Sequence, residues 1–150
     1  MENVLISACL LGFACKYCGG SNKLDETKLS ALREHFHLIP VCPETAGGLP
    51  TPRDPSERLA DRVVSNQGRD VTEQYRKGAE TALWLARRYG CRAALLKEKS
   101  PSCGSGQIYG GSFTGTLIPG DGVAAQMLKE EGLIVFGESE TDLLITVLQE

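Results

Sequence analysis

The sequence predicts an α/β fold, a Rossmann-like single domain over residues 1–150. We expect about four parallel strands, helices on both faces of the sheet and a small hairpin insertion. The first observation is that short apolar segments alternate along the chain with amphipathic helical segments, the pattern of a covered parallel sheet. The second is size: a chain of 150 residues, 41% of them hydrophobic, suffices for one domain with its own core.

The first strand is predicted at Val4–Cys9, an apolar run without alternation, as is typical of a strand buried on both faces. A loop rich in glycine and cysteine follows over residues 10–23. Asp25 is then expected to cap a helix, because its carboxylate can accept from free amides of the first turn. The apolar face of this helix consists, at helical spacing, of Leu29, Leu32 and Phe36.

The second strand is predicted at His37–Cys42, with Pro40 placing it near an edge or a strand end. Residues 43–57 hold four prolines and two glycines, which predict a loop. Arg62–Ser65 and Arg69–Val71 flank Asn66-Gln67-Gly68, and this pattern predicts a short hairpin within residues 61–71.

The strongest helical pattern begins at Thr72, the expected cap, and stops at Gly90. The third core strand is predicted at Arg92–Leu96, and a second long loop at Ser105–Gly120. The inner face of the helix is expected to comprise Tyr75, Ala79, Ala82, Leu83 and Ala86.

The last part of the chain predicts a helix from about Asp121 to Gly132 and a fourth core strand at Leu133–Phe136. Ser139 and Asp142 fit a capping box at the start of a C-terminal helix. The inward side chains of these two helices are expected to be Ala124, Met127, Leu128, Leu144, Val147 and Leu148.

Charge and hydropathy exclude several classes of function. There are 16 basic and 19 acidic residues, a net charge of −3, so we expect no nucleic-acid partner. No apolar run approaches the roughly 18–20 residues of a transmembrane segment, so no membrane association is expected. Because no basic segment precedes an apolar stretch at the N-terminus, as one would in a signal peptide, the sequence predicts a cytoplasmic protein.

Six cysteines are more than a reduced protein needs for structure, and in a reducing compartment they favour metal binding or catalysis over disulfides. Cys9 and Cys42 end the first two predicted strands, and Cys103 lies in the loop after the third. Ligands bind parallel sheets beyond the carboxyl ends of their strands, so these three thiols are expected to meet. The alternative is that each is a small buried hydrophobe, as we expect for Cys91 at the opposite edge.

Three thiolates are too few for a closed zinc or iron–sulfur site, which takes four ligands. Three ligands and an open position are instead a catalytic arrangement. Two carboxylates, Glu44 and Glu57, lie near the thiols in the sequence, and the hydroxyls of Ser100 and Ser102 precede Cys103. These groups are candidates for orienting a substrate or moving a proton.

The remaining cysteines leave alternatives open. Cys15 and Cys18 form a Cys-x-x-Cys pair, which indicates either a thiol–disulfide redox protein or half of a zinc site. The zinc hypothesis needs His35 and His37 as further ligands. A further alternative is that Cys15 joins Cys9, Cys42 and Cys103 as the fourth ligand of a closed iron–sulfur cluster. The protein would then be a non-catalytic iron–sulfur sensor or carrier.

Three blocks of the sequence together resemble a known family of short, cysteine-rich bacterial proteins, formerly a domain of unknown function: the iron–sulfur-dependent 2-thiouracil desulfurases (desulfidases). The resemblance runs from Val4 to about Gly137. The blocks are Ser7-Ala8-Cys9-Leu10-Leu11-Gly12 with Cys15; Cys42-Pro43-Glu44 with Gly47-Gly48-Leu49 and Pro52-Arg53; and Lys97 with Ser100-Pro101-Ser102-Cys103-Gly104.

The resemblance implies a [4Fe–4S] cluster with three cysteine ligands, which block matching places at Cys9, Cys42 and Cys103. One iron would stay open for the sulfur of a small thiocarbonyl substrate. The implied reaction is non-redox desulfuration of a thiolated nucleobase, such as 2-thiouracil to uracil plus sulfide, by a monomer or a homodimer.

The same blocks carry the expected catalytic groups. Glu44 is expected to act as general base and acid, with Ser100 or Ser102 binding the substrate. The alternative for Glu44 is that it caps a turn or pairs with Arg53. Cys15 and Cys18 would be accessory, although the family usually has aspartate at the position of Cys18.

Overall fold

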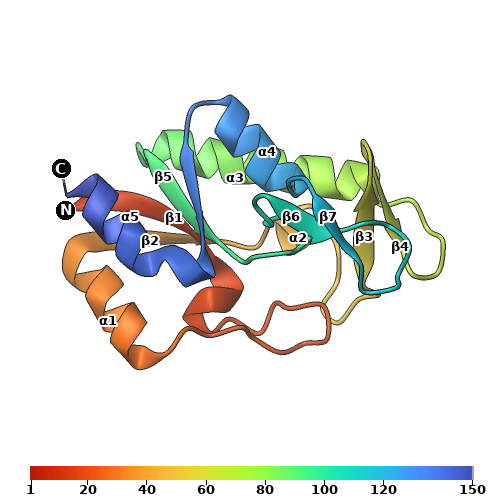
Figure 1. The fold of residues 1–150 in the computed structure, drawn as a ribbon, viewed down its shortest axis with the longest axis horizontal. Coiled ribbons are helices and arrows are strands. Elements are labelled where there is room, and N and C mark those ends of the chain that lie inside the picture. Colours follow the sequence, from red (N-terminus) through yellow and green to blue (C-terminus); the bar gives the residue numbers. More distant parts are fainter. Residues whose placement is uncertain (150) are drawn as a thin grey trace.

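A four-stranded parallel sheet forms the centre of the protein, whose computed structural model describes residues 1–149 (Figure 1). The strands are β1 (Glu2–Ser7), β2 (Phe36–Val41), β5 (Ala93–Leu96) and β8 (Ile134–Gly137), in the order β2-β1-β5-β8. Every neighbouring pair is parallel. The predicted α/β class and four core strands are therefore confirmed.

Helices cover both faces of the sheet, as predicted. One face packs against α1 (Glu26–His35) and α5 (Thr141–Leu148), and the other against α3 (Thr72–Arg88) and α4 (Val123–Glu130). Strand β1 divides its side chains between the two cores: Val4 and Ile6 enter the first, and Leu5 enters the second. Such full burial contributes roughly 1.5–3 kcal/mol per large aliphatic side chain, which holds β1 centrally.

The strand order places a topological switch point beside β1. The chain passes from β1 to β2 on one side and later returns to β5 on the other, so the connections diverge at the carboxyl ends of β1 and β5. The Ser7 hydroxyl oxygen accepts from the Lys97 amide at 2.9 Å and ties these two ends together. A ligand site is expected at such a point in an open parallel sheet.

A short helix, α2 (Pro43–Ala46), lies in the segment that the sequence predicts to be a loop. Proline fits the first helical position because it has no amide to leave unpaired. Two glycines bring α2 and α3 into backbone contact: a Cβ on Gly47 would stand 1.8 Å from the Gln74 carbonyl oxygen. A Cβ on Gly78 would stand 1.7 Å from the Pro43 carbonyl oxygen. The fold thus holds α2 firmly against α3.

Gly78→Ala is expected to destabilise the protein by about 1–3 kcal/mol, because the added methyl group must push two backbones apart. In an ordinary helix the same change stabilises by roughly 0.5–1 kcal/mol. Urea unfolding measures the difference, with Glu80→Ala on the exposed side of α3 as a control expected to stay within about 0.5 kcal/mol. Equal or greater stability of Gly78→Ala would contradict the close approach.

Two antiparallel hairpins lie at the end of the molecule away from the N-terminus (Figure 1). β4 (Arg62–Ser65) pairs with β3 (Ser56–Leu59) through a left-handed turn at Ala60, a pairing that the sequence did not predict. The predicted pairing with Arg69–Val71 is present over a short stretch: the Ser65 amide donates to the Arg69 carbonyl oxygen, the Val71 amide donates to the Val63 carbonyl oxygen, and one antiparallel bridge lies between them.

The second hairpin, β6 (Gln107–Tyr109) with β7 (Leu117–Pro119), lies in the predicted loop 105–120. Its strands have three residues each, too few for a periodic pattern to be visible in the sequence.

Asp25 caps α1 as predicted, its carboxylate accepting from the Lys28 amide at 2.8 Å. Phe36, expected on this helix, is instead the first residue of β2. Thr72 is the first residue of α3 rather than its cap, and its amide donates to the Asp70 carboxylate.

The start of α4 agrees with the prediction of Asp121 or a neighbour, since Gly122 precedes the helix, while the Asp121 carboxylate accepts from the Gly106 amide and from Lys129. The start of the C-terminal helix differs from the prediction. The capping box predicted at Ser139 is absent, since the Ser139 hydroxyl donates to Glu98 and a 3-10 turn, η2 (Glu138–Glu140), leads into α5. In the described part of the chain, no helix has the length and apolarity of a transmembrane segment.

Candidate active site

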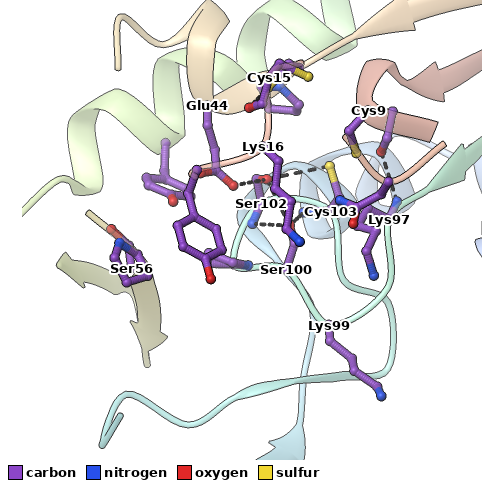
Figure 2. Close-up of a pocket in the computed structure, with 18 of the residues that line it drawn as sticks. Cys9, Cys15, Lys16, Glu44, Ser56, Lys97, Lys99, Ser100, Ser102 and Cys103 are labelled. Atoms are coloured by element: carbon purple, nitrogen blue, oxygen red, sulfur yellow. Dashed lines mark hydrogen bonds between the residues drawn. The ribbon is translucent and has the colours of Figure 1, made fainter. Parts of the chain in front are cut away.

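A cavity of about 660 Å³ opens at the carboxyl ends of β1, β2 and β5. Each of the three sequence blocks contributes to its wall (Figure 2). Four of the six cysteines line it: Cys9, Cys15, Cys42 and Cys103. Parallel topology therefore brings together the three thiols predicted to meet, with Cys15 as a fourth.

The thiols come from separate structural elements. Cys9 lies not at the end of a strand, as predicted, but in a 3-10 turn, η1 (Ala8–Leu11), because β1 already ends at Ser7. Gly12 closes this turn in a left-handed conformation that favours glycine. Cys42 is the residue between β2 and α2, and Cys103 follows β5.

Burial controls the protonation of these thiols. It raises the pKa of Cys9 and raises the pKa of Cys103 to about 12. It also raises the pKa of Cys15 to about 12, with the nearby Cys42 as the next cause. These thiols therefore keep their protons near neutral pH unless a metal displaces them, as metals do when they bind cysteine.

The donor set suits an iron–sulfur cluster better than a single ion. Within residues 1–149, no three cysteine, histidine, aspartate or glutamate side chains stand close enough to hold one metal ion. Thiols spread around a wide cavity are the donors of iron–sulfur clusters. His35 ends α1 and His37 lies in β2, and neither belongs to the cavity wall, so the geometry does not support a mixed zinc site.

Glu44 also lines the cavity, and both of its carboxylate oxygens have partners. Oε1 accepts from Arg53 Nε at 2.9 Å, and Oε2 accepts from the Ser102 hydroxyl at 3.1 Å. The side chains of Glu44 and Arg53 are only 14% and 6% exposed. The alternative considered for Glu44, pairing with Arg53, is thus what the structure contains, and the carboxylate still faces the cavity.

The two serines differ in their surroundings. Ser100 Oγ accepts from the Ser102 and Cys103 amides, at 3.1 and 2.8 Å, and so shapes the loop around Cys103. Ser102 Oγ lies 3.1 Å from Ser100 Oγ and 3.5 Å from Cys103 Sγ (Figure 2). Since Ser102 donates to Glu44, the serine hydroxyls form a chain that ends at the carboxylate.

The remaining candidate residues, Glu57, Cys91 and Cys18, form no hydrogen bond with Glu44 or with the three thiols predicted to meet, among residues 1–149. Glu57 accepts from the Gly111 and Phe113 amides and so attaches the β6–β7 hairpin to β3. Cys91 is buried in the core between the sheet and α3, as expected. Cys18 is exposed and does not belong to the cavity wall.

Sequence reasoning missed two residues beside Glu44. Tyr75, expected only as a core residue of α3, lines the cavity; burial and the negative charge of Glu44 raise its pKa, so it keeps its proton. Arg53 was considered only as a partner that would leave Glu44 without a catalytic role. The signal for Arg53 was present in the sequence, as part of the second block.

Fold and site together define an α/β protein with a cysteine-lined cavity fit for an iron–sulfur cluster. The chain belongs to the 2-thiouracil desulfurase family, whose match spans residues 4–140. The protein is therefore a desulfurating enzyme, as the sequence predicted.

The chain is also similar to two known proteins. A solved structure described as the [4Fe-4S]-dependent thiouracil desulfidase TudS has a TM-score of 0.95 and 45% identity, and 99% of each chain is covered. The protein YbbK of Bacillus subtilis (strain 168) is 41% identical over 147 residues, covering 91% of this chain and 96% of YbbK.

Proposed function

We propose that this enzyme removes sulfur from a small thiocarbonyl compound such as 2-thiouracil, with a [4Fe–4S] cluster held by Cys9, Cys42 and Cys103. The observation that carries the proposal is the meeting of these thiols with the Glu44 carboxylate in one cavity. The family and the described cluster dependence of TudS support it.

Cys9 and Cys42 follow β1 and β2 by two residues and by one residue. Cys103 lies seven residues after β5, in a loop where its amide donates to Ser100 Oγ. Cys15 lies in the long loop after η1. When bound through three thiolates, the cluster would supply an iron with an open position, a Lewis acid for the soft sulfur of the substrate.

Glu44 is the proposed proton-transfer group. The overall change, C=S plus water giving C=O plus hydrogen sulfide, balances without any oxidant or reductant. Glu44 takes a proton from the attacking water and returns it to the departing sulfur. Ser102 donates to Glu44 and so orients the carboxylate, while Ser100 holds Ser102 in place.

The cavity wall also fits a flat heterocycle. Tyr109 and Phe113, from the β6–β7 hairpin, belong to it and offer aromatic surfaces against which a pyrimidine ring can pack.

We propose that the binding partner is a small molecule and not a nucleic acid, and that a single domain carries the activity. A cytoplasmic location agrees with six free cysteines, and the protein is proposed to be a monomer or a homodimer.

Anaerobic purification and a sulfide assay test the proposal. We expect a brown protein with about four iron atoms per chain, the content of a [4Fe–4S] cluster, that converts 2-thiouracil to uracil with release of one sulfide. A colourless protein, or a brown one that releases no sulfide from any thiolated pyrimidine or nucleoside, would contradict it.

A further inference from the structure

Arg53 contacts two separate parts of the active site through its guanidinium group. Nε donates to Glu44 Oε1 at 2.9 Å, and Nη2 donates to the Cys15 carbonyl oxygen at 2.8 Å. The Arg53 amide also donates to the Tyr17 carbonyl oxygen at 2.8 Å. One residue therefore links the carboxylate on α2 to the Cys15–Tyr17 segment, which the sequence separates by more than twenty-five positions.

The third nitrogen of Arg53 is held by its own loop. Nη1 donates to Thr51 Oγ1 at 3.0 Å and to the Pro50 carbonyl oxygen at 3.2 Å. With its side chain only 6% exposed, the guanidinium thus has a partner on each nitrogen. A planar fork meets such partners in three directions, whereas a lysine ammonium is a single point charge.

The geometry points to Arg53 as a positioning residue for the desulfuration reaction: it keeps the Glu44 carboxylate and the Cys15–Tyr17 segment in one fixed arrangement. The inference rests on the proposed function, in which Glu44 transfers the proton. Arg53 fixes one carboxylate oxygen and Ser102 fixes the other, so the carboxylate cannot turn away from the cavity.

The same contact reaches the neighbourhood of Cys42. Cys42 Sγ lies 3.8 Å from the Cys15 carbonyl oxygen that accepts from Arg53. Loss of the guanidinium would remove a donor from this carbonyl and release the segment beside the proposed ligand. Arg53, which lines the cavity with every guanidinium nitrogen held by a protein acceptor, therefore orders the groups around the reacting atoms.

Kinetics of Arg53→Lys test the inference. We expect an unchanged iron content and a KM within about threefold of wild type. The kcat should fall about 10–100-fold, because small displacements of a catalytic group are costly. Arg53→Gln is the second variant and should lose at least as much. The control is Arg62→Lys. Arg62 lies on β4 and forms an exposed ion pair with Asp70, so no change in kcat or KM is expected.

Combination with Glu44→Gln separates positioning from a purely structural role. If Arg53 acts through Glu44, adding Arg53→Lys to Glu44→Gln lowers kcat no further. Losses that multiply, or a wild-type kcat in Arg53→Lys, would overturn the inference.

Hydrogen exchange of the amides of residues 13–20 gives a readout that does not depend on activity. Exchange should be faster in Arg53→Lys than in wild type and unchanged in Arg62→Lys. Unchanged exchange in Arg53→Lys would overturn the link to the Cys15–Tyr17 segment. If the wild-type protein released no sulfide, the proposed function would fail, and exchange alone would decide this link.

Discussion

Cys103→Ala is expected to abolish cluster binding and, with it, sulfide release. Cys103 is 4% exposed and lies after β5, where the cavity wall is formed by the central sheet and the loop shaped by Ser100. A cluster with three protein ligands loses one third of its protein bonds in this variant, and cysteine thiolates are the groups that hold such clusters. Iron analysis and visible absorption of protein purified without oxygen measure the effect. Cys9→Ala and Cys42→Ala should lose the cluster in the same way as Cys103→Ala.

Cys91→Ala is the matched control, because it removes a buried thiol outside the cavity. It should retain a full cluster. A full cluster in Cys103→Ala would refute the ligand assignment. Cys15→Ala separates the catalytic arrangement from a sensor or carrier: we expect it to keep its iron. Loss as complete as in Cys9→Ala would mean four protein ligands and no open iron.

Glu44→Gln is expected to retain the brown cluster but to lower turnover by roughly 10²–10⁴-fold, the usual contribution of a general acid–base group. Glutamine keeps the size of the side chain, and its amide oxygen can still accept from Arg53 or Ser102. It cannot take a proton from water and return it to sulfur. Sulfide release under saturating substrate, together with the iron content of the same sample, measures the effect.

Glu57→Gln provides a comparison at a second carboxylate of the cavity wall. Glu57 accepts from two backbone amides of the β6–β7 segment, so its replacement should cost less than tenfold in turnover. Near-normal sulfide release by Glu44→Gln with an intact cluster would remove Glu44 from the mechanism. Loss of the cluster in that variant would show that Glu44 is structural or a ligand.

The sequence by itself determined the core of the fold and the place of the site. Buried strands such as β1, predicted at Val4–Cys9 and observed at Glu2–Ser7, and amphipathic helices such as α3 are visible as local patterns, since each reflects the environment of consecutive residues. From strand direction alone it followed that Cys9, Cys42 and Cys103 would share one edge, because parallel strands carry their carboxyl ends together.

Only the tertiary structure decided how the site is built. The backbone contact of Gly47 with α3, the pairing of β3 with β4, and the contacts of Arg53 with Glu44 and Cys15 all join residues that are distant in sequence or lie in irregular loops. Periodicity cannot encode such contacts, because each depends on where two separate segments meet in space once the core has formed. The sheet could therefore be predicted from the sequence, whereas the orientation of the Glu44 carboxylate at its edge could not.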